Sequence, residues 1–315
     1  MNAPIATSEG PRTTRSRRRP SGLRARLAHD LEAVGGRHDE ARFYEGPAGD
    51  PGLCGGPGSM SWEIHADMAS LVVAGNAAIL MEVLHPSVMH GVYTQSSYRE
   101  EPVRRARNTL GYVLRTTFAS TDAATRVIDG VKRMHARVSG TRADGVSYRA
   151  LDPELIAWVH TCIPWAVMTA FERTRRPLSR ADKDRYLKEQ AVIGRMGGAD
   201  RVPESVDELH DFVEAMRPQL AMNDQTVDFV AFLEARVGPH RVSALEFIDR
   251  AAALRGSMAL MPDWARRMTG THQPAWLDRA YFKHDCRWRA NLIRWAYPEA
   301  PCVAMAHARA TSAHG

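Results

Sequence analysis

The sequence predicts an all-α protein in which about ten or more helices form a single domain. Apolar residues recur with the 3.6-residue period of amphipathic helices, and helix start and stop signals separate these segments. No run with the two-residue period of a half-buried strand is evident, and no segment repeats at a fixed interval. The sequence has no GxGxxG after a strand, no Walker A motif and no GxSxG elbow, so nucleotide-binding and hydrolase functions have no support in it.

The composition is that of a globular protein with a substantial core. The chain has 315 residues, of which 44% are hydrophobic and 25% are charged, and both values are typical of globular domains. No run of 18 apolar residues occurs, so we expect no membrane span. The four cysteines show neither the spacing of a zinc site nor the pattern of a disulfide framework.

The first 20 residues carry most of the net charge. Five arginines and one glutamate give this segment a charge of +4, out of +6 for the whole chain. Its Arg, Pro, Ser and Thr content predicts a disordered basic tail. No apolar segment follows the arginines, which argues against a secretion signal, and we expect a cytoplasmic protein. Nucleic-acid binding is the weaker reading of this charge, because no recognition-helix motif accompanies it.

The domain is expected to begin near residue 21 with a short amphipathic helix. Leu23, Leu27 and Leu31 share one face of that helix, and two glycines follow it. Residues 42–59 are rich in glycine and proline and predict a long loop, a kind of segment that is often functional. Residues 62–90 are apolar on nearly every side, which predicts a helix buried at the centre of the domain and broken at Pro86.

Two further helices are expected to meet at Ser120. The first begins at Pro102, since proline is tolerated in the first turn of a helix. Its apolar stripe is expected at Val103, Ala106, Leu110, Val113 or Leu114, and Phe118. The second begins near Thr121 and stops at Gly140. Its buried face is expected at Ala124, Val127, Ile128, Val131 and Val138.

The remaining segments are also helical. Asp152, Pro153 and Glu154 form a strong start signal for an apolar helix, which Pro164 is expected to kink. Ser179 and Ser205 begin two more helices with a capping-box pattern. Helical patterns continue from about residue 225 to residue 297, which places the end of the domain near residue 300. Residues 301–315 are expected to form a C-terminal tail.

His135 interrupts an otherwise aliphatic helix face. On periodicity alone it is either a core histidine bonded to a backbone carbonyl or an axial ligand of a metal or haem iron. His160 is its rival as a ligand, because it lies beside the apolar stripe of its own helix. His65, His85 and His90 lie on or near the apolar segment 62–90, and none of them forms a zinc or non-haem iron motif.

Arg105, Thr109 and Tyr112 share one face of the helix that begins at Pro102, because they are spaced by four and three residues. Such a face is either a solvated edge or the rim of a pocket. In a pocket, the guanidinium binds a carboxylate, and the guanidinium and hydroxyl together can hydrogen-bond oxygen at an iron.

Several segments occur in an order and spacing that match a known family. They are GPGSMSWEIHADMASLVVAGNAAILMEVLHPSVMHGV, EPVRRARNTLGYV, VKRMHARVSG, DGVSYRALDPELIAWVHTC, PLSRADKDRYLKE and VPESVDEL. Across about residues 55–215 the chain resembles the MpaB/rubber-oxygenase catalytic-domain family. The resemblance implies a globin-like helical fold that holds haem b and uses dioxygen on a hydrophobic substrate.

The resemblance also implies roles for individual residues. Arg105 and Thr109 match an R-x-x-x-T element that lines the haem pocket of rubber oxygenases, and His135 matches the axial histidine. Rubber oxygenases carry a lysine before that threonine, where this chain has Asn108. We therefore expect a more open distal side of the iron and a substrate other than polyisoprene. The glutamate that rubber oxygenases use as a base has no position assigned by the sequence.

The resulting hypothesis is a haem-dependent oxygenase or oxidase that uses dioxygen or peroxide. Its substrate would be a small, largely apolar metabolite, in tailoring or degradative chemistry. His135 would bind the iron, and Arg105, Thr109, Tyr112 and His160 are the other candidates for contacts with the cofactor. A non-catalytic haem-binding sensor shares all these residues and is the first alternative. A helical nucleic-acid-binding regulator is the second.

Overall fold

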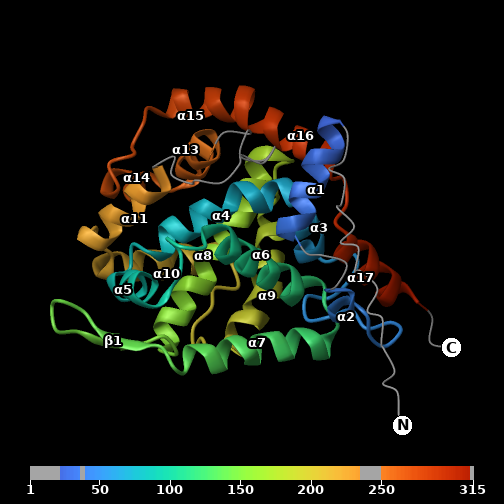
Figure 1. Cartoon of the computed structure of the whole chain (residues 1–315), viewed down its shortest axis with the longest axis horizontal. Coiled ribbons are helices and arrows are strands. Elements are labelled where there is room, and N and C mark those ends of the chain that lie inside the picture. Colours follow the sequence, from blue (N-terminus) through green and yellow to red (C-terminus); the bar gives the residue numbers. More distant parts are fainter. Residues whose placement is uncertain (1–21, 36–39, 235–249, 313–315) are drawn as a thin grey trace, which may run out of the picture.

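The computed structural model describes residues 22–35, 40–234 and 250–312, and they form an almost entirely helical protein (Figure 1). The first half contains α1 (Leu23–Gly35), α2 (Ala41–Tyr44), α3 (Met60–Ala66), α4 (Met68–Glu82), α5 (Pro86–Gln95), α6 (Pro102–Phe118) and α7 (Thr121–His135). The second half contains α8 (Pro153–Thr174), α9 (Arg180–Gly197), α10 (Val206–Met216), α11 (Asp224–Glu234), α13 (Arg250–Leu260), α14 (Asp263–Met268), α15 (Ala275–Tyr281), α16 (Arg287–Ala296) and α17 (Pro301–Thr311). The predicted all-α class is confirmed. The expected N-terminal tail lies outside the described residues.

The core is built on α4 and α8, which make the most extensive helix pair in the described part of the chain. Both helices are apolar on most sides, as their sequences predict, and other helices surround them. Ala69 and Ala77 of α4 and Ala157 and Ala166 of α8 are fully buried. Small side chains of this kind let helix axes approach closely. The indole of Trp158 donates to the carbonyl of Glu82, which joins α8 to the last turn of α4.

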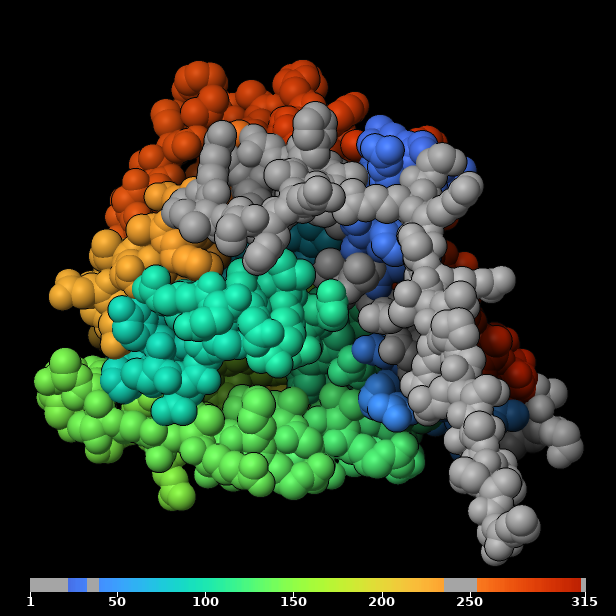
Figure 2. Space-filling view, in the orientation of Figure 1, coloured from blue at the N-terminus to red at the C-terminus, as the bar shows by residue number. Residues whose placement is uncertain are grey.

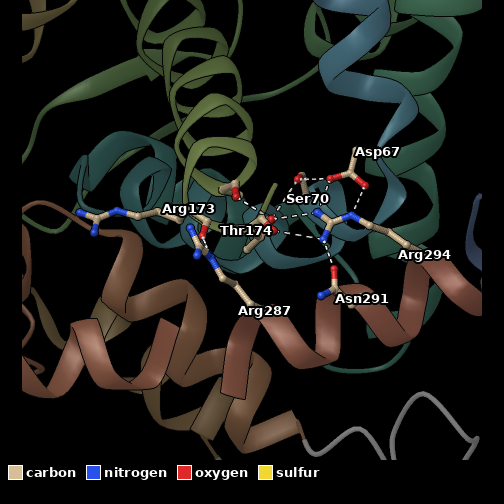
Figure 3. Close-up of polar contacts among 8 residues, drawn as sticks. Asp67, Ser70, Arg173, Thr174, Arg287, Asn291 and Arg294 are labelled. Carbon is tan, nitrogen blue, oxygen red and sulfur yellow. Dashed lines mark hydrogen bonds and ion pairs between the residues drawn. The ribbon is translucent and has the colours of Figure 1, made fainter. Parts of the chain in front are cut away.

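The expected long helix over residues 62–90 is wrong in one respect, because it breaks at Asp67 as well as at Pro86. The axes of α3 and α4 differ by 90° across Asp67. Its carboxylate accepts two hydrogen bonds from Arg294, at 2.8 and 2.6 Å, and one from the hydroxyl of Ser70 (Figure 3). The partner that fixes this bend is 227 residues away in the sequence, and local patterns do not reveal it.

The junction of α6 and α7 is fixed by the glycine-rich loop that precedes α3. The Asp50 carboxylate of this loop accepts hydrogen bonds from the backbone N–H and hydroxyl of Thr121, at the start of α7. Gly52 has φ of +70°, and a Cβ there would meet the carbonyl oxygen of Ala119 at 2.6 Å. Only glycine fits so close an approach. The Ser120 side chain caps α7 as expected.

Residues 301–315 were expected to be a tail, and this prediction is wrong for Pro301–Thr311, which form α17. Arg309 of α17 is buried and donates to the carbonyl oxygens of Tyr44, Asp50, Phe118 and Ala119. The last carbonyls of a helix have no partner within the helix, so Arg309 satisfies those at the end of α6. The four acceptors come from distant parts of the chain, and the sequence therefore did not indicate the role of Arg309.

Two smaller differences concern the region after α7. This helix ends at His135, earlier than the expected stop at Gly140. The segment between α7 and α8 contains a short antiparallel hairpin, β1 (Ser139–Thr141) and β2 (Ser147–Arg149), where no strand was predicted. Strands of three residues are too short to show a two-residue period. The helix starts predicted at Asp152, Ser179 and Ser205 are confirmed as the N-caps of α8, α9 and α10.

One described helix, α8, is long and apolar enough to cross a membrane, and 56% of its apolar stretch is buried inside the protein. The pair α3 and α4 passes the same test only as a single span, and that pair is bent by 90°. Packing of α8 along α4 accounts for the hydropathy of both segments.

Candidate functional site

The first half of the candidate site is the N-terminal part of α6. Arg105 and Tyr112 are half-buried, whereas Thr109 between them is exposed. Burial raises the pKa of Tyr112 to about 12. The expected apolar stripe of this helix is correct from Leu110 onward, but Val103 and Ala106 before it are exposed. The N-terminal turns of α6 therefore form an edge that the core does not cover.

Arg105 faces a buried acid that the sequence did not single out. Glu82 ends α4 and is only 8% exposed. Burial raises the pKa of its carboxyl to about 7, and the nearby Arg105 guanidinium opposes this rise. Burial likewise lowers the pKa of Arg105, and Glu82 opposes that change.

Glu82 and Arg105 do not touch each other. Within the described residues, no ion pair of 4.0 Å or less joins them, and neither side chain has a hydrogen-bond partner. The two charges therefore influence each other's pKa without direct contact. Unpaired buried charges are costly and occur mainly at functional sites.

The second half of the site is the end of α7, where His135 is the last helical residue. The expected inward face of α7 is confirmed: Ala124 and Ile128 are buried, and Val127, Val131 and His135 are half-buried. Burial lowers the pKa of His135, so the imidazole is neutral at pH 7. A neutral imidazole keeps one nitrogen lone pair for a metal.

The two halves lie at the same end of one helix pair. The α6 and α7 helices pack against each other and reverse direction at Ser120. Arg105 lies about four turns before this reversal and His135 about four turns after it. Figure 2 shows a hollow between these helices on the face in view, with the teal α6 above it and the green α7 below it.

His160 is held elsewhere. Its Nε2–H donates to the carbonyl oxygen of Gln190, at 2.9 Å, and burial lowers its pKa to about 4. Its ring presses against Gly194 of α9, where a Cβ would come within 2.5 Å of the ring. The adjoining cavity of about 10 Å³ has space for about one water molecule. These contacts favour a packing role for His160.

The other histidines near the apolar segment are also engaged. His65 is buried, with Nδ1 2.7 Å from the Thr117 hydroxyl and Nε2 2.7 Å from the Tyr186 hydroxyl. His85 caps α5, and His90 bonds to the Tyr148 hydroxyl at 2.9 Å. Of these and the two histidines above, His135 alone lacks a hydrogen-bond partner among the described residues.

This donor set fits haem better than a bare metal ion. In the described ranges, no three His, Cys, Asp or Glu side chains are placed to hold a metal together. Zinc and non-haem iron require such convergent ligands. Haem iron carries its own four nitrogen ligands and needs one axial side chain. One free, neutral imidazole at the end of an apolar helix face meets that need.

Comparisons with known proteins identify relatives of the chain. A sequence profile described as "ER-bound oxygenase mpaB/B'/Rubber oxygenase, catalytic domain" matches residues 62–295. Two proteins, uncharacterized protein Rv2237 of Mycobacterium tuberculosis and uncharacterized protein Mb2261 of Mycobacterium bovis, are each 28% identical over 134 residues. That match covers 41% of this chain and 51% of each relative. The chain therefore spans about half the length of these curated relatives. No solved structure matches.

Proposed function

Because the chain belongs to the family of the mpaB and rubber-oxygenase catalytic domain, we propose that it is a haem b-dependent oxygenase or oxidase. Its substrate would be a small, largely apolar metabolite, its oxidant dioxygen or peroxide, and its location the cytoplasm. The membership supports oxygenase chemistry. The haem, the substrate class and the roles of individual residues are our inference.

The observation that carries the proposal is the state of His135. It is neutral, half-buried and without a partner in the described part of the chain, on a helix face that is otherwise aliphatic. Either ring nitrogen can therefore supply a lone pair. We assign His135 as the residue that would hold the haem iron, and we assign His160 to the packing of α8 against α9.

When bound, the haem would supply the oxygen chemistry. The Arg105 guanidinium would hold a carboxylate of the haem or a developing negative charge on the substrate. Thr109 and Tyr112, on the same helix, would hydrogen-bond polar atoms at the mouth of the pocket. Glu82, with a pKa of about 7, is suited to accept a proton from the substrate and to release it to solvent. It is our candidate for the base that the sequence left unassigned.

The substrate class follows from the surroundings of these groups. Glu82 lies at the end of a helix whose other buried residues are apolar or small, which favours a largely apolar molecule with a single acidic or polar position. Asn108 is exposed, and its amide is neutral where rubber oxygenases have a positively charged lysine. A substrate other than polyisoprene is therefore part of the proposal.

A haem sensor without catalysis remains the second candidate, and Glu82 argues against it. A binding site for haem alone needs no titratable acid inside an apolar helix pair. Burial of such a group costs stability. A role of the carboxyl in proton transfer would explain why the protein retains it.

The absorption spectrum of the purified, haem-reconstituted protein tests the proposal. We expect a Soret band that His135→Ala abolishes or shifts and that His160→Ala leaves in place. Circular dichroism on both variants controls for unfolding. A protein that takes up no haem overturns the proposal, and a Soret band that depends on His160 moves the ligand assignment there.

A further inference from the structure

The outer edge of the molecule carries an unusual row of exposed tryptophans. Helix α15, a π-helical turn (Phe282–Cys286) and α16 form one unbroken helical segment, drawn in orange and red in Figure 1. Trp276, Trp288 and Trp295 of this segment are 64%, 60% and 51% exposed. They are three of the seven tryptophans in the chain. Exposed indole rings are unfavourable in water, and they commonly mark a surface that meets something else.

The π turn aligns these tryptophans. Trp276 and Trp288 are twelve positions apart, a spacing that would turn them away from each other on a regular α-helix. A π turn adds one residue to the helix, so the effective spacing is eleven, which is three full turns. Trp295 follows Trp288 by seven positions, again on the same face. The row therefore runs along about 30 Å of one helix face.

The basic and acidic residues of this segment differ in their exposure to solvent. Its exposed ionic residues, Arg279, Lys283 and Arg287, are all basic. Both of its acids are partly buried and pair with arginines: Asp278 with Arg266, and Asp285 with Arg289. The fully exposed charges of residues 275–296 are therefore all positive, and they share this segment with the three exposed indole rings.

Hydrogen bonds to the core hold α16 with its tryptophans on the outside. Arg294 donates to both carboxylate oxygens of Asp67 and to the backbone and side-chain oxygens of Thr174 (Figure 3). Arg287 Nε donates to the carbonyl oxygen of Arg173, 3.0 Å away. These bonds tie α16 to the end of α8 and to the bend between α3 and α4, which leaves the tryptophans outside.

Helix α1 extends the same face. Its Leu23 is 56% exposed, and the Arg24 guanidinium lies 5.6 Å from the centre of the Trp295 ring. A groove between these two helices is lined by Leu23, Arg24, Ala25, Ala28 and Trp295. The cationic and aromatic character thus continues beyond the end of α16.

We propose that this face docks the protein on an anionic lipid bilayer, with α15 and α16 parallel to the membrane plane. Helices that lie in the interface present Trp and Leu to the acyl boundary and Lys and Arg to the headgroups, and tryptophan prefers this depth. The proposal concerns peripheral attachment, and it does not depend on the chemistry proposed above.

The charge pattern favours a membrane over a protein partner. In a two-fold dimer through this face, the exposed cations of one copy would meet an identical face that offers no exposed acid to pair with them, which is unfavourable. Hot spots of protein interfaces cluster at the centre of a patch. Here Arg279 and Lys283 lie between Trp276 and Trp288, Arg287 is next to Trp288, and Arg24 contacts Trp295, so each ring has a basic neighbour that can bind a lipid phosphate.

Flotation of the full-length protein with vesicles tests the proposal. We expect binding to an equal mixture of phosphatidylcholine and phosphatidylglycerol and much weaker binding to phosphatidylcholine alone. Trp288→Ala combined with Trp295→Ala should lower the partition coefficient several-fold. The matched control is Val227→Ala, which removes a comparably exposed apolar side chain on α11. It should leave partition unchanged.

A charge reversal provides the second arm. Lys283→Glu should lower partition onto anionic vesicles by about fivefold or more, since each basic residue near such a surface contributes about fivefold. Lys188→Glu, on exposed α9 surface, is the control and should have a smaller effect. Equal losses for both lysines, or none for the tryptophan variant, would assign binding to other basic parts of the chain and overturn the proposal. A dimer in sedimentation experiments that the tryptophan variant dissociates would also overturn it.

Discussion

At the scale of single residues, the candidate site contains an acid and a histidine whose side chains have no hydrogen-bond partner among the described residues. His135 stood out in the sequence because it interrupts an aliphatic face. Glu82 was overlooked, because a single polar residue within an apolar segment was taken only as a break in its hydrophobicity. A signal was nevertheless present. When a helix is apolar on every side, it has no polar face, so a charged residue in it must be buried.

Replacement of Glu82 by Gln tests the role of this carboxyl. If Glu82 accepts a proton, activity should rise as pH increases through about 7, and Glu82→Gln should lose about 10²- to 10⁴-fold in kcat. Removal of Arg105 takes away the charge that lowers this pKa, so Arg105→Met should move the midpoint to higher pH. The measurement is kcat, followed by oxygen consumption, against pH. A Glu82→Gln enzyme with the wild-type profile would exclude this role.

The same carboxyl makes a prediction for stability. Its pKa is about 7 in the folded protein and 4.5 ordinarily, so between these values the folded state binds more protons than the unfolded state. Stability should therefore fall as pH rises from about 4.5 to 7 and then level off, with a total loss of up to about 3 kcal/mol. Urea unfolding of the wild type should show this fall, and Glu82→Gln should remove it.

At the scale of helices, most starts could be predicted and the tertiary bends could not. Serine and aspartate caps are local signals, and those at Ser120, Asp152 and Ser179 proved correct. The break at Asp67 depends on Arg294, and the end of α6 depends on Arg309. Both arginines reach their partners across nearly 200 residues or more. Because no local pattern encodes such a partner, the bend and the last helix were missed.

The contact between α8 and α9 yields a prediction that separates packing from ligation. Gly194→Ala should destabilise the protein by about 1–3 kcal/mol, because the new methyl group would collide with His160. Gly75→Ala is the matched control, since that helical glycine has open space around it. It should be neutral or stabilise by up to about 1 kcal/mol. Thermal or urea unfolding measures both changes.

A double variant completes this comparison. If His160 is a packing residue, Gly194→Ala in the His160→Ala background should cost much less than in the wild type, because the collision is removed. Strict additivity of the two changes would show that the ring is not the obstacle. It would return His160 to the set of candidate cofactor ligands.

At the scale of the whole molecule, the class of fold was predictable because it depends on the 3.6-residue spacing of apolar residues. Each segment shows this spacing without reference to the others. The candidate site draws on three helices, of which α6 packs against both α7 and α4. Arg105 and His135 belong to consecutive helices that reverse direction at Ser120, so their placement at the same end of this pair follows from the sequence. Glu82 belongs to the central helix pair, and its approach to Arg105 depends on how the whole core packs.

Binding of haem should stabilise this whole assembly, because a ligand that binds only the folded state adds its free energy to folding. Haemin at a hundred times its dissociation constant contributes about 2.7 kcal/mol, which for a chain of this size corresponds to a rise in Tm of about 4 °C. We expect this rise in the wild type and in Glu82→Gln, because Glu82 is assigned to proton transfer and not to ligation. His135→Ala should show little or no rise, since the axial bond is lost. An equal rise in His135→Ala would mean that haemin binds elsewhere, and the helix pair of α6 and α7 would then lose its assignment as the cofactor site.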